Sequence, residues 1–284
     1  MINWILSGAG SEKVMSLLEL KGLCLMAGEQ ILVHEMNLSI KAGDWLTVIG
    51  ESGSGKTLTG LSIGRLLPHG VRHAAGQITF NGQSLSELPE RQINKLRGKE
   101  IAYVFQDYTG TFSPFLRIGK QLDETIRVHY PWGRKERKER ILNVLEQVSL
   151  PAKRVVESYP FQLSGGQLQR VSIATAMLLE PKLLIADEPT SALDWVTGTE
   201  ILDLLIQLQE KSGCSILFIT HDLKLARRCA DQIVIMREGR ILEEGKAEVV
   251  LTQATHPYTQ RLLAAESMLN YTEPGVVPER GEMG

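Results

Sequence analysis

The chain has 284 residues, of which 43% are hydrophobic and 23% charged, with a formal net charge of −2. This length allows one large domain or two lobes, and the composition is that of an ordinary soluble protein. A net charge so near zero gives no overall basic field, so we expect no nucleic-acid partner. The cysteines Cys24, Cys214 and Cys229 are scattered, which favours inert thiols over a disulfide framework or a metal site.

The two ends of the chain are expected to lie outside the folded domain. No apolar run approaches the roughly 20 residues that a membrane helix needs. The opening MINWILSGAG is apolar but short and lacks the basic segment of a signal peptide. We expect residues 1–14 to be a disordered tail or to precede the true start, a folded domain over 15–265, and a short extension over 266–284.

The N-terminal part of the chain predicts strands interrupted by a single helix. Short apolar or alternating runs bounded by turn residues are typical of strands. After a glycine-rich loop, apolar residues take up a helical spacing that stops at Pro68. Strands are predicted at residues 17–25, 31–40, 45–49, 76–80 and 101–105, and the helix at residues 58–67.

A mostly helical segment, at about residues 107–165, separates this part from a second series of strands and helices. Within it the pattern predicts helices at 118–128 and 134–148. Alternation of strands and helices then resumes, which predicts an α/β fold with mostly parallel strands and a helical insertion. These later helices are predicted at 167–179, 199–209 and 223–229, and the strands at 183–186, 215–220, 233–236 and 240–243.

The stretch GESGSGKT fits the P-loop pattern G-x-x-x-x-G-K-[ST] and lies between a predicted strand and a predicted helix, as the motif requires. Its glycines let backbone N–H groups surround phosphates. Its lysine supplies charge to the β- and γ-phosphates, and its threonine hydroxyl is a ligand for Mg²⁺. The alternative is a flexible glycine turn with an incidental lysine. The expected ATP-binding residues are Gly50, Glu51, Ser52, Gly53, Ser54, Gly55, Lys56 and Thr57.

Polar side chains follow three further predicted strands. Asp187 and Glu188 end an apolar strand, and α/β sheets bind ligands at this edge. We expect Asp187 to hold Mg²⁺, directly or through water, and Glu188 to polarise the attacking water as a general base. Gln106 could bind Mg²⁺ or water through its amide oxygen, and His221 could donate to a γ-phosphate oxygen. Taken alone, a glutamine at a strand end is more often a plain surface residue, a lone histidine in such a loop is usually an ordinary loop residue, and the Asp-Glu pair could merely end a strand and start a turn.

A second anion site is predicted far from the P-loop in sequence. In FQLSGGQLQR, Ser164, Gly165, Gly166 and Gln167 begin a predicted helix. Small residues at that position expose the N–H groups of the helix N-terminus, which attract phosphates. One nucleotide does not need two such sites, and the residues alone leave the purpose of the second one open.

The ordered motifs resemble those of ATP-binding cassette (ABC) ATPases. They are the P-loop, Gln106, LSGGQ, the strand ending in Asp187 and Glu188, the stretch SALD that ends at Asp194, and His221. The resemblance covers about residues 15–265. It implies a P-loop NTPase fold with an antiparallel N-terminal β subdomain and an inserted helical subdomain.

The same resemblance implies a head-to-tail dimer of two ATPase domains. Ser164, Gly165, Gly166 and Gln167 would then complete the ATP site of the partner, and Asp194 would lie at the dimer interface. Gln106 would couple the nucleotide to the helical insertion and so to a membrane partner. The second anion site is thus explained by a second nucleotide.

Finer features resemble the peptide/nickel importer group. They are VFQD followed by TFSPF, YPFQLSGG, a late HPYT, and GVRHAAG, which resembles the nickel-type first ATPase subunit. The resemblance implies hydrolysis of ATP with Mg²⁺ at the cytoplasmic face of the membrane. The implied partners are a second ATPase subunit, preferably a different one, two membrane permease subunits and, indirectly, an extracytoplasmic solute-binding protein. The implied cargo is nickel, a metal chelate, or di- or oligopeptides.

Two departures from the family pattern accompany the resemblance. Met26 and Ala27 occupy the region where an aromatic residue usually stacks on adenine, and no cysteine follows Cys229, so we expect no iron–sulfur cluster. The alternative function is a non-transport ABC ATPase of translation or DNA repair. Such proteins usually carry two fused cassettes, long coiled coils or zinc insertions, whereas this sequence has one set of motifs.

Overall fold

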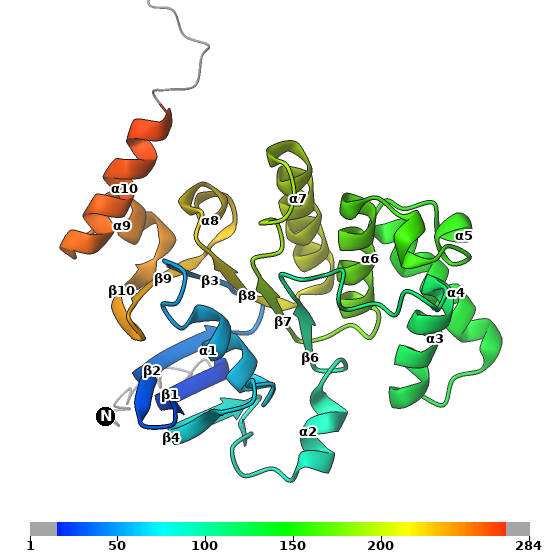
Figure 1. Cartoon of the computed structure of the whole chain (residues 1–284), viewed down its shortest axis with the longest axis horizontal. Helices are drawn as coiled ribbons and strands as arrows, with labels where there is room; N and C mark the ends of the chain where they lie inside the picture. Colours follow the sequence, from blue (N-terminus) through cyan, green and yellow to red (C-terminus); the bar gives the residue numbers. More distant parts are fainter. Residues whose placement is uncertain (1–15, 271–284) are drawn as a thin grey trace, which may run out of the picture.

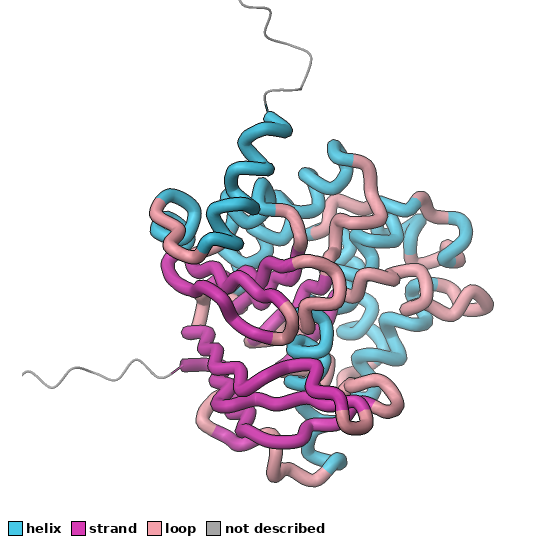
Figure 2. Tube along the Cα trace, turned by 60° about the vertical axis from the view of Figure 1, so that its left-hand side comes forward, coloured by secondary structure: helices cyan, strands magenta, loops and turns pink. Residues whose placement is uncertain are grey.

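The computed structural model describes residues 16–270, which form two sheets and a set of helices (Figure 1). The tail expected over residues 1–14, the expected start at Met15, and residues 271–284 of the expected extension lie outside the described residues. Helix α10 (Pro257–Asn270) runs through the boundary expected at residue 265. The two groups of strands lie one above the other in Figure 2.

The first sheet is antiparallel, in the order β2-β1-β4-β5, as the fold prediction requires. Strands β1 (Ser16–Ala27) and β2 (Gln30–Lys41) form a hairpin around Gly28, whose φ of 57° suits glycine. Strand β4 (Val71–Phe80) begins five residues before the predicted strand, and β5 (Gln83–Ser84) follows it. The prediction was too short because residues 71–75 (VRHAA) contain Arg72, His73 and two alanines, which are weak strand formers, and their strand conformation comes from pairing with β1.

The second sheet has six strands in the order β10-β9-β3-β8-β7-β6. Five of them run parallel, and β10 is antiparallel to β9, the hairpin predicted around Glu238 and Gly239. This confirms the predicted α/β core. The strands are β3 (Trp45–Gly50), β6 (Ile101–Val104), β7 (Leu183–Asp187), β8 (Ser215–Thr220), β9 (Gln232–Arg237) and β10 (Arg240–Lys246).

The two faces of this sheet bury alternate residues of each strand. On β8, Ile216 and Phe218 pack in the core shared with the helical insertion, whereas Leu217 and Ile219 pack in the core shared with the antiparallel sheet. Because successive strand side chains point to opposite faces, a strand covered on both sides reads as one continuous apolar run. Such runs are the signal that predicted β3, β7 and β8.

Each of the six predicted helices is present, and the described residues contain four further α-helices that were not predicted. Helix α1 ends at Ile63, four residues before the predicted end, and the chain leaves the helical conformation at Arg65, whose φ is 52°. Helix α7 begins at Trp195, four residues early, because Asp194 caps it. The helices are α1 (Lys56–Ile63), α3 (Ile118–His129), α4 (Arg134–Gln147), α5 (Ala152–Val155), the short 3-10 helix η1 (Pro160–Gln162), α6 (Gly165–Met177), α7 (Trp195–Ser212), α8 (Leu223–Cys229), α9 (Ala247–Thr252) and α10.

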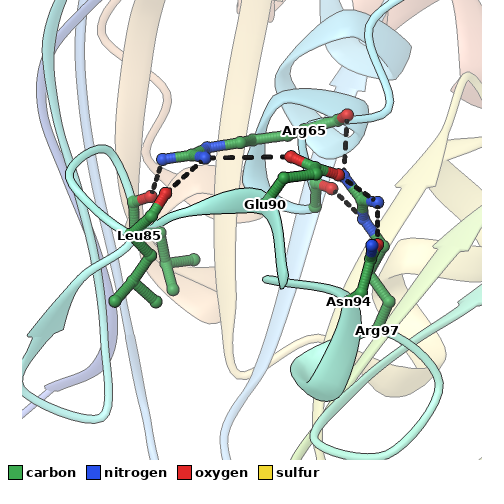
Figure 3. A network of polar contacts seen from close by, with 7 residues as sticks. Arg65, Leu85, Glu90, Asn94 and Arg97 are labelled. Atoms are coloured by element: carbon green, nitrogen blue, oxygen red, sulfur yellow. Dashed lines mark hydrogen bonds and ion pairs between the residues drawn. The ribbon is translucent and has the colours of Figure 1, made fainter. Parts of the chain in front are cut away.

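Helix α2 (Glu90–Leu96) was not predicted, and a polar network holds it to the end of α1 (Figure 3). The Arg97 guanidinium donates to the carbonyls of Gly64 at 2.6 Å and Arg65 at 3.1 Å, and its ion pair with Glu90 spans 2.7 Å. Arg65 in turn donates to the backbone carbonyls of Leu85 and Leu88. With one buried side chain, α2 has too little apolar periodicity to be predicted and depends on these long-range contacts.

Candidate functional site

The P-loop connects the end of β3 to the start of α1. A Cβ on Gly50 would lie 2.2 Å from the carbonyl oxygen of Met236, so only glycine fits between β3 and β9 there. Gly53 and Gly55 have φ values of 80° and 98°, which L side chains rarely adopt. These glycines explain the sharp turn from strand to helix, which directs the first N–H groups of α1 toward one point.

The Lys56 side chain is buried and folds back over the loop. Its ammonium donates to the carbonyl oxygens of Gly50 at 2.7 Å and Glu51 at 2.9 Å. Burial lowers the pKa of Lys56, and the nearby carboxylates of Glu188 and Asp187 oppose that shift. The ammonium is therefore fixed next to two carboxylates at the mouth of the loop.

Thr57 and Asp187 meet directly beneath the P-loop. The Thr57 hydroxyl donates to Asp187 Oδ1 at 3.1 Å, and Asp187 is only 7% exposed. Burial raises the pKa of Asp187, against the opposing effect of the Thr57 hydrogen bond. A hydroxyl and a carboxylate oxygen brought together in this way are the hard ligands that Mg²⁺ prefers, so this pair fits the expected metal.

Glu188 and His221 form the second polar pair at this edge of the sheet. Glu188 Oε2 lies 3.0 Å from His221 Nδ1. The Glu188 backbone has a φ of 45°, which costs a non-glycine residue roughly 1–3 kcal/mol. The Glu188 N–H donates to the carbonyl oxygen of Ile219 at 2.9 Å, and the Glu188 carbonyl accepts from the N–H and the hydroxyl of Ser191. The strained turn after β7 is thus held in place by β8 and by the following loop.

Thr57, Glu188 and His221 line one cavity of about 570 Å³, whereas Asp187 is not among its lining residues. The P-loop forms one wall, and Gln106, Glu188 and His221 form the other, so the structure brings together residues from four strand ends that sequence order keeps far apart. Leu58, which we did not predict, adds an apolar contact at the rim. The P-loop residues of the wall are Glu51, Ser52, Gly53, Ser54, Gly55, Lys56 and Thr57.

The signature residues Ser164, Gly165, Gly166 and Gln167 are not among the residues that line this cavity. Ser164 caps α6: its N–H donates to the Gln167 side chain at 3.1 Å, and its hydroxyl accepts from the Gln167 N–H at 3.3 Å. A Cβ on Gly166 would lie 2.9 Å from the Thr197 methyl group. The helix predicted to begin at the signature is therefore present with a capped N-terminus, and its first residues do not line the cavity at the P-loop of the same chain.

Asp194 lies between these two sites. Its carboxylate accepts from the Thr197 N–H at 3.0 Å and the Thr197 hydroxyl at 2.7 Å, and these bonds lower the pKa of Asp194. With Glu188 and His221 it lines a neighbouring cavity of about 210 Å³. Asp194 thus begins α7 within the same loop region as the Glu188–His221 pair.

Two residues that sequence reasoning missed connect the site to its surroundings. The Gln169 side chain on α6 is buried and donates to the carbonyl of Pro189 at 2.7 Å, directly after Glu188. The Tyr103 hydroxyl on β6 donates to the carbonyl of Gly60 in α1 at 3.1 Å. Neither has a motif of its own, although Gln169 follows the signature and could have been suspected from its polar character on a buried helix face.

Comparison with known proteins decides the family. The family model for ABC transporters matches residues 33–191, which include the P-loop and the Asp187–Glu188 strand. The chain belongs to the ABC transporter family. The predictions of an ABC-type fold and of an ATP-binding, ATP-hydrolysing subunit of the importer class are confirmed.

Named relatives lie within this family. The chain is 41% identical to the metal-staphylopine import system ATP-binding protein CntD of Staphylococcus aureus, over 90% of this chain and 95% of that protein. It is 40% identical to the dipeptide transport ATP-binding protein DppD of Escherichia coli, over 87% of this chain and 77% of that protein. These relatives agree with the predicted peptide/nickel importer group.

A solved ABC structure matches the fold. The dimeric post-hydrolysis structure of the ATP-binding cassette MJ0796, bound to ADP and Pi, superposes with a TM-score of 0.72 at 32% identity, covering 81% of this chain and 98% of that one. Within residues 16–270 of the ABC chain described here, no helix combines the length and apolar character needed to cross a bilayer.

Proposed function

We propose that this ABC subunit hydrolyses Mg-ATP in a dimer of ATPase domains that powers uptake of a metal chelate or a peptide. The observation that carries the catalytic part is the convergence of the Thr57–Asp187 and Glu188–His221 pairs on the P-loop cavity. One pair suits a metal ion beside the phosphates, and the other pairs a carboxylate base with an imidazole.

Each group has a role that follows from its chemistry. The P-loop N–H groups and Lys56 bind the β- and γ-phosphates, and Thr57 and Asp187 would hold Mg²⁺, which neutralises charge on the phosphate oxygens when bound. Glu188 accepts the proton of the attacking water. His221 can donate from Nδ1 to the Glu188 carboxylate, and as an imidazolium, in which both ring nitrogens carry a proton, it can also donate to a γ-phosphate oxygen.

The dimer follows from the position of the signature. Because Ser164, Gly165, Gly166 and Gln167 lie away from the P-loop cavity of their own chain, the N-terminus of α6 is proposed to meet the γ-phosphate bound by the partner. Asp194 and the exposed Trp195 and Val196 that follow it are proposed to contact that partner. A large exposed Trp beside an exposed Val is uncommon on a monomer surface. The favoured partner is a different ATPase subunit.

An aromatic patch on the insertion is proposed to bind the permease subunits. Phe115 is 85% exposed and Phe161 is 73% exposed. Phe161 stacks on Tyr159 with ring centroids 5.5 Å apart, and the Arg117 guanidinium lies 5.9 Å from the Tyr159 ring centroid. Exposed aromatic groups of this kind mark interaction surfaces. The residues of this patch come after Gln106 in the chain, and Gln106 lines the nucleotide cavity. Gln106 is therefore proposed to connect the patch with the nucleotide.

The cargo is proposed from the relatives. CntD is part of a metal-staphylopine import system and DppD of a dipeptide transporter, so the candidates are a metal chelate, nickel itself, or di- and oligopeptides. A permease pair and an extracytoplasmic binding protein would select the cargo, and the ATPase would act at the cytoplasmic face of the membrane. The 41% identity over 95% of CntD favours the metal chelate.

Affinity purification from a detergent extract tests this function. The tagged full chain should bring down membrane permease subunits and a second ATPase subunit, and the reconstituted complex should take up cargo only with ATP. Glu188→Gln in the same complex is the control, since it should abolish uptake while the complex still assembles. Purification of the chain with ribosomes or DNA-repair proteins, and without a permease, would contradict the importer and support the non-transport alternative.

A further inference from the structure

The stretch THPYT has no role in the proposed reaction, yet it is fixed to the central sheet at the start of α10. The Glu243 carboxylate on β10 accepts from the Thr255 N–H at 2.7 Å, the Thr255 hydroxyl at 3.0 Å and the His256 N–H at 3.3 Å. His256 Nδ1 accepts from the Tyr258 N–H at 3.1 Å. These bonds set the first turn of α10 against β10, and Figure 1 shows α9 and α10 next to β9 and β10.

This anchor directs Tyr258 toward the P-loop. Tyr258 is 5% exposed and packs with Ile49 of β3 and Ile235 of β9. The Arg237 guanidinium lies 5.0 Å from the centroid of its ring. Tyr258, Arg237 and Glu51 line a cavity of about 320 Å³. The C-terminal helix therefore shares a cavity with the second residue of the P-loop.

The Tyr258 hydroxyl is enclosed and has no hydrogen-bond partner among the described residues, and its side chain lines the same cavity as Glu51. Burial and Glu51 raise the pKa of Tyr258, and Arg237 opposes them, so the phenol stays protonated and can donate to the carboxylate. The backbone carbonyl of the same Glu51 accepts from the Lys56 ammonium at 2.9 Å. Glu51 therefore lies between α10, with which it shares a cavity, and the lysine of the P-loop.

We propose that Tyr258 is a positioning residue for ATP binding: its hydroxyl holds Glu51, and Glu51 orients the carbonyl that fixes Lys56. The inference rests on the proposed role of the P-loop. A residue that acts through another should change the affinity for ATP more than the chemical step, because it holds the binding groups and does not touch the reacting atoms. The C-terminal segment would thereby set the affinity of the ATP site.

The test measures Mg-ATP binding and turnover by full-length variants. In Tyr258→Phe the ring packing is kept and only the hydroxyl is lost, so we expect the dissociation constant to rise roughly three- to tenfold. The value of kcat at saturating ATP should change little, and so should the melting temperature. Tyr130→Phe is the matched control, because Tyr130 stacks on Trp132 in the helical insertion and its hydroxyl loss should leave binding unchanged.

A double variant tests the route through Glu51. If Tyr258 acts on Glu51, adding Tyr258→Phe to Glu51→Gln should raise the dissociation constant far less than it does in the wild-type chain. Unchanged binding in Tyr258→Phe, or an equal effect in both backgrounds, would overturn the inference. Lys56→Ala separates the two proposals: if it also leaves binding unchanged, the P-loop assignment itself fails.

Discussion

At the scale of single residues, the site separates binding from chemistry. Lys56 and the P-loop, which follow β3, are proposed to hold the phosphates, whereas Glu188 directly follows β7, two strands away in the sheet, and its carboxylate lies 3.0 Å from His221 Nδ1. The backbone of Glu188 has a φ of 45°, which is strained for a side chain of that size. Strain retained next to a cavity is typical of functional positions, where it fixes the direction of the side chain.

Glu188→Gln should retain ATP binding and lose hydrolysis. Removing a general base that acts in the transition state should lower turnover by roughly 10²–10⁴-fold. Steady-state phosphate release by the assembled transporter, with nucleotide binding measured in parallel, checks this. A near-normal rate would remove Glu188 from the role of base.

Lys56→Ala should weaken ATP binding. The ammonium makes charge-assisted contacts at the P-loop, and losing such contacts with a phosphate should raise the dissociation constant roughly 10- to 100-fold. Equilibrium binding of a fluorescent ATP analogue to the full chain measures it. Lys211→Ala, a lysine in the last turn of α7, is the control and should bind the analogue normally. Equal affinities of Lys56→Ala and the wild-type chain would contradict the assignment.

At the scale of elements, helix N-termini carry the proposed dimer contacts. Helices α6 and α7 both begin with a capping side chain, Ser164 and Asp194. Gly166 lies in the first turn of α6, and a Cβ built on it would lie 2.9 Å from the Thr197 methyl group of α7. The two helices are therefore packed closely where the second phosphate is proposed to bind.

Gly166→Asp should block dimer closure and leave ATP binding by its own P-loop intact. The added carboxylate would repel the γ-phosphate of the partner site. In the Glu188→Gln background, size-exclusion chromatography with ATP should show a dimer that Gly166→Asp abolishes. Gly166→Ala brings the same crowding without the charge and should retain more dimer. An intact dimer of Gly166→Asp would refute the proposed role of the signature.

Arg97→Ala should destabilise the chain without changing its chemistry. The side chain satisfies the carbonyls of Gly64 and Arg65, so its removal should lower the free energy of unfolding by roughly 1–3 kcal/mol. Chemical denaturation measures this. Arg91→Ala, on the exposed side of the same helix α2, should have a smaller effect. Similar losses for both variants would show that the network contributes little.

At the scale of the whole molecule, the ATP site and the aromatic patch lie on different parts of the fold. The antiparallel sheet and the helical insertion pack on opposite faces of the central sheet, in separate apolar clusters. The P-loop is built on the central sheet, whereas Phe115 and Phe161 belong to the insertion. This arrangement lets the proposed permease contact lie away from the phosphates and still connect to them through Gln106.

Phe115→Ser with Phe161→Ser should separate ATP hydrolysis from transport. Both side chains are exposed, so their loss should leave folding and the basal ATPase rate of the isolated chain unchanged while permease co-purification falls. Val128→Ser, 78% exposed near the far end of α3, is the matched control and should co-purify normally. Equal recovery of the permease with both variants would place the contact elsewhere.

Much of the central sheet could be predicted from the sequence, because β3, β7 and β8 are buried on both faces and therefore continuous apolar runs. Elements that depend on distant partners could not. The start of β4 has few strand-forming residues and pairs with β1, and α2 is fixed by Arg65 and Arg97. The end of α1 was predicted four residues too late, because its apolar spacing continues past Arg65, where the backbone φ is 52°.

For this protein, sequence by itself determined the P-loop, the strand-end Asp187 and Glu188 and the signature, since each depends on residue types at fixed short spacings. Tertiary structure alone decided what those groups meet. It paired Thr57 with Asp187 and Glu188 with His221, kept the signature out of its own chain's ATP cavity, and brought Tyr258 to Glu51. Short motifs report local backbone chemistry, whereas contacts between residues far apart in sequence exist only once the sheet orders its strands.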